Sequence, residues 1–263
     1  MKEIKNKIFT GQATNGVKDY SELSKIVQET FFDYLVKDVK IENGWKVLDI
    51  GCGTGNNSFK LSQMVGEQGK VVAIDPIKDR ITEANSSYSS PNLHFYEGSA
   101  KDVTKFGSDF DLVVAATVIH WIPPQERQEV FQGIMQTMKE GAQFIFNMTK
   151  KDTFNMIPIL AKIKTNPYKG GNYWPVPEIK DIEQLASNSG YRDVQVKEQE
   201  MVQRLPSLDQ YLRWAASSFH TRDYDQTLKE LRDVCQNEDV SCLYDKDGHL
   251  VYKQKYFFAY CRK

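Results

Sequence analysis

The sequence lacks several features that would assign it quickly to a class of protein. It has no excess of basic residues, because 34 Lys and Arg stand against 35 Asp and Glu, and this balance gives no general attraction to nucleic acid or to a membrane surface. No apolar run approaches the roughly 18 residues of a membrane span, and the polar start MKEIKNKIFTG lacks the apolar segment of a secretion signal. We therefore expect a soluble, cytoplasmic protein without a nucleic-acid partner.

Cysteine is also scarce. The four cysteines show no C-x-x-C spacing, which predicts reduced thiols rather than a disulfide framework or a zinc site, and no other metal site is predicted. The 263 residues, 40% of them hydrophobic, are enough for one substantial core. We expect one domain, as a monomer or a homodimer. The cysteines are Cys52, Cys235, Cys242 and Cys261.

What the sequence does have is a glycine-rich turn between two regular elements. Residues 45–50 form a short apolar run, and Gly51, Gly53 and Gly55 follow at alternate positions. Residues 56–65 then show helical spacing of apolar side chains. A strand, a glycine turn and a helix in this order allow a ligand to come close to the backbone, because glycine has no Cβ atom.

Strand-like and helix-like segments alternate after this turn. This alternation predicts a parallel sheet covered by helices. Towards the C-terminus, residues 245–248 read as a hairpin turn before an aromatic-rich strand at 252–261. The other predicted strands are 70–75, 92–97, 110–116, 143–148 and 191–203, and the predicted helices are 17–39, 77–88, 123–138, 179–189, 208–218 and 224–234.

Three segments lie outside this alternation. Residues 1–16 are polar and are predicted to form a mobile N-terminal arm. Residues 151–178 and 205–240 are predicted to be insertions that cover the substrate, because ligands of open α/β sheets bind beyond the carboxyl ends of the strands. Within the first insertion, 152–163 is predicted as one helix, interrupted by Pro158.

The residue pattern from Asp49 to Gly55 is D-x-G-x-G-x-G. It differs from the dinucleotide fingerprint G-x-G-x-x-G, and it resembles motif I of the class I S-adenosylmethionine-dependent methyltransferases. The resemblance implies S-adenosyl-L-methionine as cofactor. It also implies an α/β, Rossmann-like, seven-stranded sheet, with five parallel strands and a C-terminal antiparallel hairpin.

The same resemblance implies a set of cofactor-binding residues at the strand ends. Asp75 ends the second strand and is placed to accept hydrogen bonds from both ribose hydroxyls, although an Asp there could instead cap the next helix. Ser99 stands where the family often has an acid, so that either its hydroxyl or Asp102 would contact adenine. The predicted cofactor-binding residues are Asp49, Gly51, Cys52, Gly53, Gly55, Asp75, Pro76, Ser99, Ala100 and Thr117.

The segment TVIHWI at 117–122 precedes two prolines that open a helix. This arrangement resembles small-molecule carboxyl methyltransferases of the juvenile hormone acid and trans-aconitate types. By that resemblance, Gln12 and Trp121 would line the reaction centre. His120 is the third predicted catalytic residue.

A carboxylate acceptor explains why few acids and bases are needed, because it is already ionised at neutral pH and can attack the methyl group without a base. The leading hypothesis is therefore methyl-ester formation on a small, apolar acid. Two alternatives stay open: methylation of a hydroxyl or amine with His120 as base, and a cofactor-binding protein without turnover. The predicted substrate-binding residues, which could instead be packing residues, are Tyr173, Trp174, Trp214 and His220.

Overall fold

The computed structural model describes residues 14–150, 153–165, 177–218 and 223–263. Contacts divide the chain into two compact units. The first, here called the sheet unit, combines Phe31–Lys150, Trp174–Gln199 and Tyr256–Lys263. The second, the insertion unit, combines Met1–Thr30, Lys151–Tyr173 and Glu200–Lys255, so it takes in most of the predicted cover segments.

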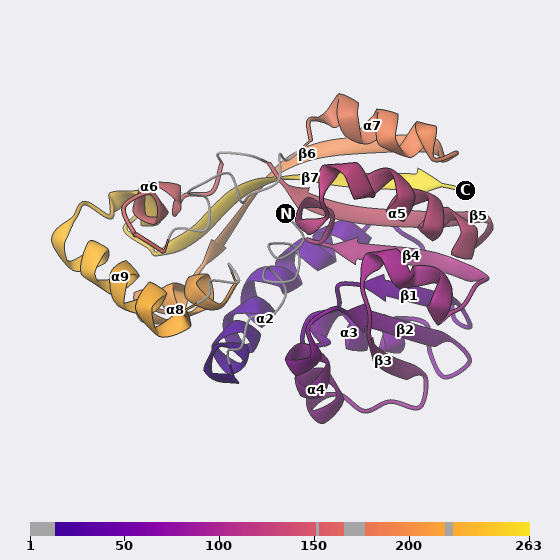
Figure 1. Ribbon diagram of the computed structural model, residues 1–263, viewed down its shortest axis with the longest axis horizontal. Coiled ribbons are helices and arrows are strands. Elements are labelled where there is room, and N and C mark those ends of the chain that lie inside the picture. Colours follow the sequence, from indigo (N-terminus) through magenta and orange to yellow (C-terminus); the bar gives the residue numbers. More distant parts are fainter. Residues whose placement is uncertain (1–13, 151–152, 166–176, 219–222) are drawn as a thin grey trace. The chain divides into compact units, whose positions relative to one another are not determined.

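A seven-stranded sheet in the order β3-β2-β1-β4-β5-β7-β6 is the central element (Figure 1). Neighbouring strands from β3 to β5 pair in parallel, and β7 pairs with β5 in antiparallel orientation. The predicted α/β sheet, with five parallel strands and an antiparallel end, is confirmed. Its strands are β1 (Lys46–Ile50), β2 (Lys70–Asp75), β3 (Leu93–Glu97), β4 (Phe110–Ala116), β5 (Met138–Thr149), β6 (Arg192–Arg204) and β7 (Val251–Arg262).

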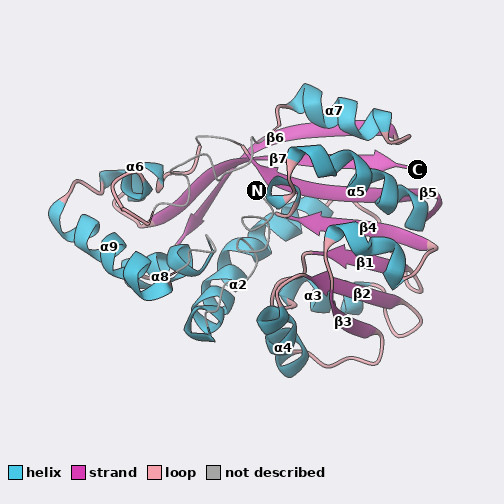
Figure 2. Cartoon of the chain, in the orientation of Figure 1, coloured by secondary structure: helices cyan, strands magenta, loops and turns pink. Residues whose placement is uncertain are grey.

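Helices alternate with the parallel strands, as the colouring of Figure 2 makes visible. The helix α3 follows the glycine turn and contacts β2 and β3, while α5 contacts β5, η1 and α7. The bounds in this part of the chain are α2 (Thr14–Val36), α3 (Asn56–Met64), α4 (Lys78–Ser87), η1 (Ala100–Phe106), η2 (Ile119–Trp121), α5 (Pro124–Thr137) and α7 (Ile179–Asn188).

Two predicted elements differ from the observed ones. The strand predicted at 143–148 begins earlier, at Met138, because the pairing of β4 with β5 shifts register between Phe110 and Leu112 and takes in the preceding residues. The single helix predicted at 152–163 is wrong. Among the described residues 153–163, only α6 (Ile157–Leu160) is helical, and Pro158 lies in its first turn. A proline in a helix interior would remove a hydrogen bond and clash with the preceding turn.

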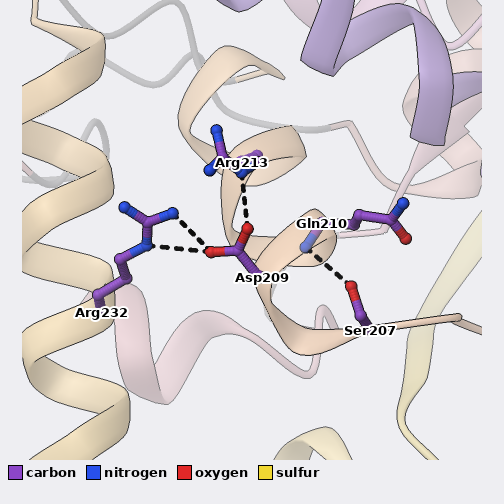
Figure 3. Close-up of polar contacts among 5 residues, drawn as sticks. All are labelled: Ser207, Asp209, Gln210, Arg213 and Arg232. Atoms are coloured by element: carbon purple, nitrogen blue, oxygen red, sulfur yellow. Dashed lines mark hydrogen bonds and ion pairs between the residues drawn. The ribbon is translucent and has the colours of Figure 1, made fainter.

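In the insertion unit, an ion-pair group joins α8 (Leu208–Ser218) to α9 (Tyr224–Asn237). Asp209 accepts hydrogen bonds from Arg213 Nε at 2.7 Å and from Arg232 Nη2 at 2.6 Å (Figure 3). The two arginines hold the pKa of the Asp209 carboxyl below its usual range. Because all three side chains are exposed to solvent, each pair contributes about 1 kcal/mol or less.

Asn155 is the polar centre of the insertion unit. Its Oδ1 accepts hydrogen bonds from the Tyr211 hydroxyl and the Lys253 N–H, and its Nδ2 donates to the carbonyls of Cys242 and Val251. The rings of Phe154, Tyr211, Trp214 and Tyr252 pack on one another beside it in the chain. Three of the four hydrogen bonds of Asn155 are partly buried, and we infer that Asn155 helps to fix the arrangement of these segments.

No helix in the described part of the chain is both long enough and apolar enough to cross a membrane.

The core of the sheet unit is aromatic where α5 meets β5. Phe131 of α5 contacts the rings of Phe144, Phe146 and Tyr191 edge-on, at centroid distances of 5.3, 5.5 and 6.2 Å. Such edge-to-face pairs add about 0.5–1.5 kcal/mol each to the free energy of burial. The Tyr191 hydroxyl also donates to the Phe131 carbonyl at 3.0 Å, so one helix position ties three segments together.

We predict that Phe131→Ala lowers the free energy of unfolding by about 3–5 kcal/mol, because it leaves a cavity in a fully buried aromatic cluster. Urea titration followed by circular dichroism measures this loss. Met64→Ala, at a side chain that is 41% exposed, is the control, with a change of about 0.5 kcal/mol or less. Equal losses in the two variants would contradict the assignment of this core.

Candidate functional site

The turn after β1 has a backbone that only glycine adopts without strain. Gly51, Gly53 and Gly55 have φ angles of +71°, +57° and +91°, in the left-handed region that disfavours residues with a Cβ atom. A Cβ atom on Gly51 would lie 2.3 Å from Val118 Cγ2, and one on Gly55 would lie 2.7 Å from Phe95 Cζ. The turn is therefore packed against its neighbours on the side where a Cβ would stand.

The carboxylate of Asp75 joins two loops. Its Oδ2 accepts a hydrogen bond from the Gly53 N–H at 3.0 Å, and its Oδ1 accepts one from the Ile77 N–H at 2.9 Å. The residue that caps α4 is Ile77 rather than Asp75, so the carboxylate does not serve as the helix cap. Because each carboxylate oxygen has a further lone pair, Asp75 keeps acceptor capacity for a diol.

Burial raises the pKa of Asp75, while the charge of Arg80 and the two amide hydrogen bonds act in the opposite direction. The pKa of Asp49 is more strongly shifted. Burial raises its pKa to about 7, although a 2.6 Å hydrogen bond from the Ser58 hydroxyl opposes the shift and the charge of Asp75 adds to it. The site thus holds two acidic groups beside the glycine turn, one of which titrates near neutral pH.

The first turn of α3 presents polar atoms that lack partners in the described structure. Gly55 is the capping residue and supplies no side chain, which leaves the first N–H groups of the helix directed outward. Asn56 Nδ2 and Asn57 Oδ1 are buried atoms without a hydrogen-bond partner. No sequence signal distinguishes these two asparagines beyond their place after the third glycine.

The loop after β3 forms a closed hydrogen-bonded turn. The Ser99 hydroxyl donates to Asp102 Oδ2 at 2.6 Å, and Lys105 Nζ contacts Asp102 Oδ1 at 2.6 Å. These partners lower the pKa of Asp102. Ser99 and Asp102, the two predicted adenine contacts, therefore act as a pair, and their role toward adenine stays a prediction.

Thr117 turns the chain sharply after β4. Its φ angle of +62° is left-handed, which costs a β-branched residue about 1–3 kcal/mol. The next residues lead into η2, where the Trp121 N–H donates to the Val118 carbonyl at 2.8 Å. Thr117, His120 and Trp121 thus lie on one short loop, and its Val118 side chain contacts the glycine turn at Gly51.

His120 is 2% exposed, and its Nδ1 is buried without a hydrogen-bond partner. Burial, together with the nearby positive charge of Arg127, lowers its pKa to about 3. Arg127 is itself buried and donates from Nε to the Ile122 carbonyl at 2.9 Å. Sequence reasoning missed Arg127, because nothing in its helical spacing distinguishes a buried arginine from a surface one.

The predicted substrate-binding residues, together with Gln12, divide into two groups. Trp214 belongs to the insertion unit, where its indole N–H donates to the Ser24 hydroxyl at 2.9 Å. Its role toward substrate stays a prediction. Gln12, Tyr173, Trp174 and His220 lie outside the described residues.

Comparison with known proteins finds similarity to methyltransferases. Residues 47–141 match the family model described as a methyltransferase domain. The arsenite methyltransferase of Rattus norvegicus is 26% identical over 200 residues, which are 67% of this chain and 51% of the relative. The demethylmenaquinone methyltransferase of Oceanobacillus iheyensis is 25% identical over 182 residues, 62% of this chain and 76% of the relative.

Solved structures agree with the fold. The phosphoethanolamine N-methyltransferase 2 of Haemonchus contortus, in complex with S-adenosyl-L-methionine, superposes with a TM-score of 0.60 at 14% identity, over 97% of this chain and 58% of that one. The chain spans about half the length of the arsenite methyltransferases that it matches. At this identity the superposition shows the fold alone.

The sheet thus has the fold of this solved methyltransferase structure, and residues 47–141 are similar to a methyltransferase domain. The residues at the site fit S-adenosylmethionine: a Cβ atom on Gly51 or Gly55 would clash with a neighbour, Asp75 has spare acceptor capacity, and Asn56 and Asn57 present unpartnered polar atoms beside the turn. The finer resemblance to juvenile hormone acid and trans-aconitate methyltransferases stays a prediction.

We predict that Asp75→Asn weakens binding of S-adenosylmethionine about 10- to 100-fold, the loss expected when a hydrogen bond to a charged group is removed. Isothermal titration calorimetry measures the dissociation constant. Asp111→Asn is the matched control, since Asp111 also accepts a backbone N–H, from Lys46 at 2.8 Å, but lies at the amino end of β4. Unchanged affinity in Asp75→Asn would refute the ribose assignment.

A second prediction concerns pH. Because the pKa of Asp49 is higher in the folded chain than in the unfolded one, its contribution to stability is present below about pH 4 and is lost as pH rises to about 7. The loss is on the order of 4 kcal/mol at about 1.4 kcal/mol per pH unit. Asp49→Asn removes this contribution, so its unfolding free energy should fall less than that of the wild type between pH 5 and 8. Parallel slopes would contradict the assignment.

Proposed function

We propose that the protein transfers a methyl group from S-adenosylmethionine to the carboxylate of a small, apolar acid, producing a methyl ester. The observation that carries the proposal is the state of His120, which is buried and has a pKa lowered to about 3. At neutral pH its imidazole is therefore uncharged and is a weak base.

The weak basicity of His120 distinguishes methyl acceptors that need a general base from those that do not. Hydroxyl and ammonium acceptors must lose a proton when they are methylated, and a general base for that step works best with a pKa near the working pH. A carboxylate is already ionised at neutral pH and needs no base. The low pKa of His120 thus favours the carboxylate and argues against the alternative in which His120 removes a proton.

The charge beside His120 also favours an anionic acceptor. The Arg127 guanidinium is close enough to His120 to lower its pKa, and in a buried environment a positive charge attracts an anion more strongly than it would in water. A neutral imidazole has one N–H donor, which suits the orientation of a carboxylate oxygen. His120 follows the carboxyl end of β4, and Arg127 lies in the first turns of the next helix, α5.

Catalysis under this proposal consists of orientation rather than acid–base chemistry. S-adenosylmethionine supplies the methyl group as an electrophilic sulfonium. Asp75 and the glycine turn hold the cofactor, while the Thr117–Trp121 loop presents the acceptor in line and excludes water. Fixing two reactants in this way can account for about 7–11 kcal/mol of a barrier. Gln12 and Trp121 are proposed to position the acceptor carboxylate.

The names of the relatives suggest other acceptors, arsenite and a demethylmenaquinone. An arsenite acceptor would be recognised by thiols. Burial raises the pKa of Cys52 well above its usual value and that of Cys261 to about 12, so both are neutral thiols at neutral pH. Burial also raises the pKa of Cys235, to about 11, and that of Cys242, so these two thiols of the insertion unit are neutral at neutral pH as well. These observations support the acid over arsenite.

We predict that a panel of medium-chain and terpenoid monocarboxylic acids yields methyl esters, detected by mass spectrometry, while phenols, amines and arsenite do not react. The rate with the best acid should show no inflection between about pH 6 and 9 that depends on His120, because both the acceptor and His120 keep one charge state across this range. An inflection from Asp49, whose pKa is raised to about 7, should persist in His120→Asn.

His120→Asn keeps a donor at the position and should leave the shape of this pH profile unchanged. His94→Asn, on β3, is the control for loss of a histidine elsewhere in the sheet. One outcome would contradict the ester proposal: the wild-type rate rises through an inflection near pH 6–7, and His120→Asn loses that inflection. So would methyl transfer to an amine, a phenol or arsenite with the acids inert.

A further inference from the structure

The loop that carries His120 and Trp121 is held by a side chain outside the predicted site. Asn147 lies on β5 and is fully buried. Its Oδ1 accepts a hydrogen bond from the Thr117 N–H at 3.0 Å, and its Nδ2 donates to Thr117 Oγ1 at 3.3 Å. The Asn147 backbone carbonyl also accepts a hydrogen bond from the same Thr117 N–H, at 3.1 Å. One buried amide thus binds both the backbone and the side chain of Thr117.

Thr117 needs such a partner because of its conformation. With φ at +62° it is one of three non-glycine residues with positive φ in the described chain, and β-branched residues are among the least tolerant of that region. An observed outlier of this kind persists only where the surroundings over-determine it, and outliers concentrate at functional sites. Here the surroundings include the side-chain amide and the backbone carbonyl of Asn147, and only the amide reaches both the Thr117 N–H and its hydroxyl.

The conformation of Thr117 determines the course of the next four residues. Val118 comes directly after it, and the Val118 side chain occupies the space where Gly51 would carry a Cβ atom. The Val118 carbonyl then accepts the Trp121 N–H at 2.8 Å and so closes η2. A change at Thr117 would therefore move both the contact with the glycine turn and the residues proposed to face the acceptor.

We propose that Asn147 is a positioning residue for methyl transfer: it holds Thr117 in the left-handed conformation and thereby fixes the 117–121 loop against the glycine turn. The effect of Asn147 on turnover rests on the proposed function, because turnover can be measured only with an acceptor. The effect of Asn147 on the conformation of the 117–121 loop does not depend on the acceptor.

The experiment compares three variants. Asn147→Ala removes the amide. The double variant Asn147→Ala with Thr117→Asn removes the amide and replaces Thr117 by a residue that enters the left-handed region more readily, since a short polar side chain can hydrogen-bond locally there. Asn92→Ala is the matched control. The side chain of Asn92 donates two hydrogen bonds to backbone, to Ser62 O and Gly66 O, at the amino end of β3, away from the site.

Two readouts are taken with folded protein, checked by circular dichroism. Hydrogen exchange of residues 117–122, measured by mass spectrometry with S-adenosylhomocysteine bound, reports the loop without any acceptor. Steady-state kinetics separates kcat from KM. We expect Asn147→Ala to speed exchange of 117–122 and to lower kcat at least about 10-fold, because small misplacements of reacting groups are costly, with KM for the cofactor changed about 3-fold or less.

The double variant should recover slow exchange and several-fold of the lost kcat, whereas Asn92→Ala should change neither readout. A purely structural Asn147 would lower stability like Asn92→Ala, without altering exchange of 117–122 or kcat, and this result would overturn the proposal. Failure of the double variant to recover either readout would also overturn it. If no acid is methylated but exchange behaves as expected, the ester proposal fails and the positioning role stands.

Discussion

Close approach of backbone to side chain at the glycine turn is the constraint on which the site depends. Gly51 accommodates Val118, and Gly55 accommodates Phe95, at separations that no Cβ atom would permit. These contacts pack the turn after β1 against Phe95 of β3 and against the loop after β4. Asp75 adds a polar link, because its carboxylate binds the turn at Gly53 and its own loop at Ile77. The turn thus connects the carboxyl ends of β1, β2 and β4, and it is also part of the predicted cofactor site.

Local patterns explain why the sheet could be predicted from the sequence. The segments 71–74 and 112–116 are continuous apolar runs, as buried parallel strands require, and glycines mark the start or end of several elements. The position of Asp75 followed from its place at the end of β2. Where prediction failed, at 152–163, the apolar spacing was helical but Pro158 could not lie in a helix interior. The sequence pattern alone did not show whether the helical spacing of apolar residues or Pro158 would determine the structure of this segment.

The chemistry of the site could be predicted only in part, because it depends on residues far apart in the sequence. Nothing in TVIHWI shows that His120 is buried beside Arg127, so its lowered pKa required the folded chain. Asn147 lies 30 residues from Thr117, and the link between them needs the pairing of β4 with β5. Trp214 is predicted to bind substrate, yet no sequence signal indicates its hydrogen bond to Ser24, which lies 190 residues away.

The Asn155 cluster has a consequence for the time course of synthesis. The hydroxyl of Tyr211 and the amide of Lys253 lie 56 and 98 residues after Asn155 in the chain. A ribosome that adds about 5–20 residues per second needs roughly 5–20 s to cover the longer interval. Over that period Asn155 has no partner at position 253, so its full set of hydrogen bonds can form only after Lys253 has been synthesised.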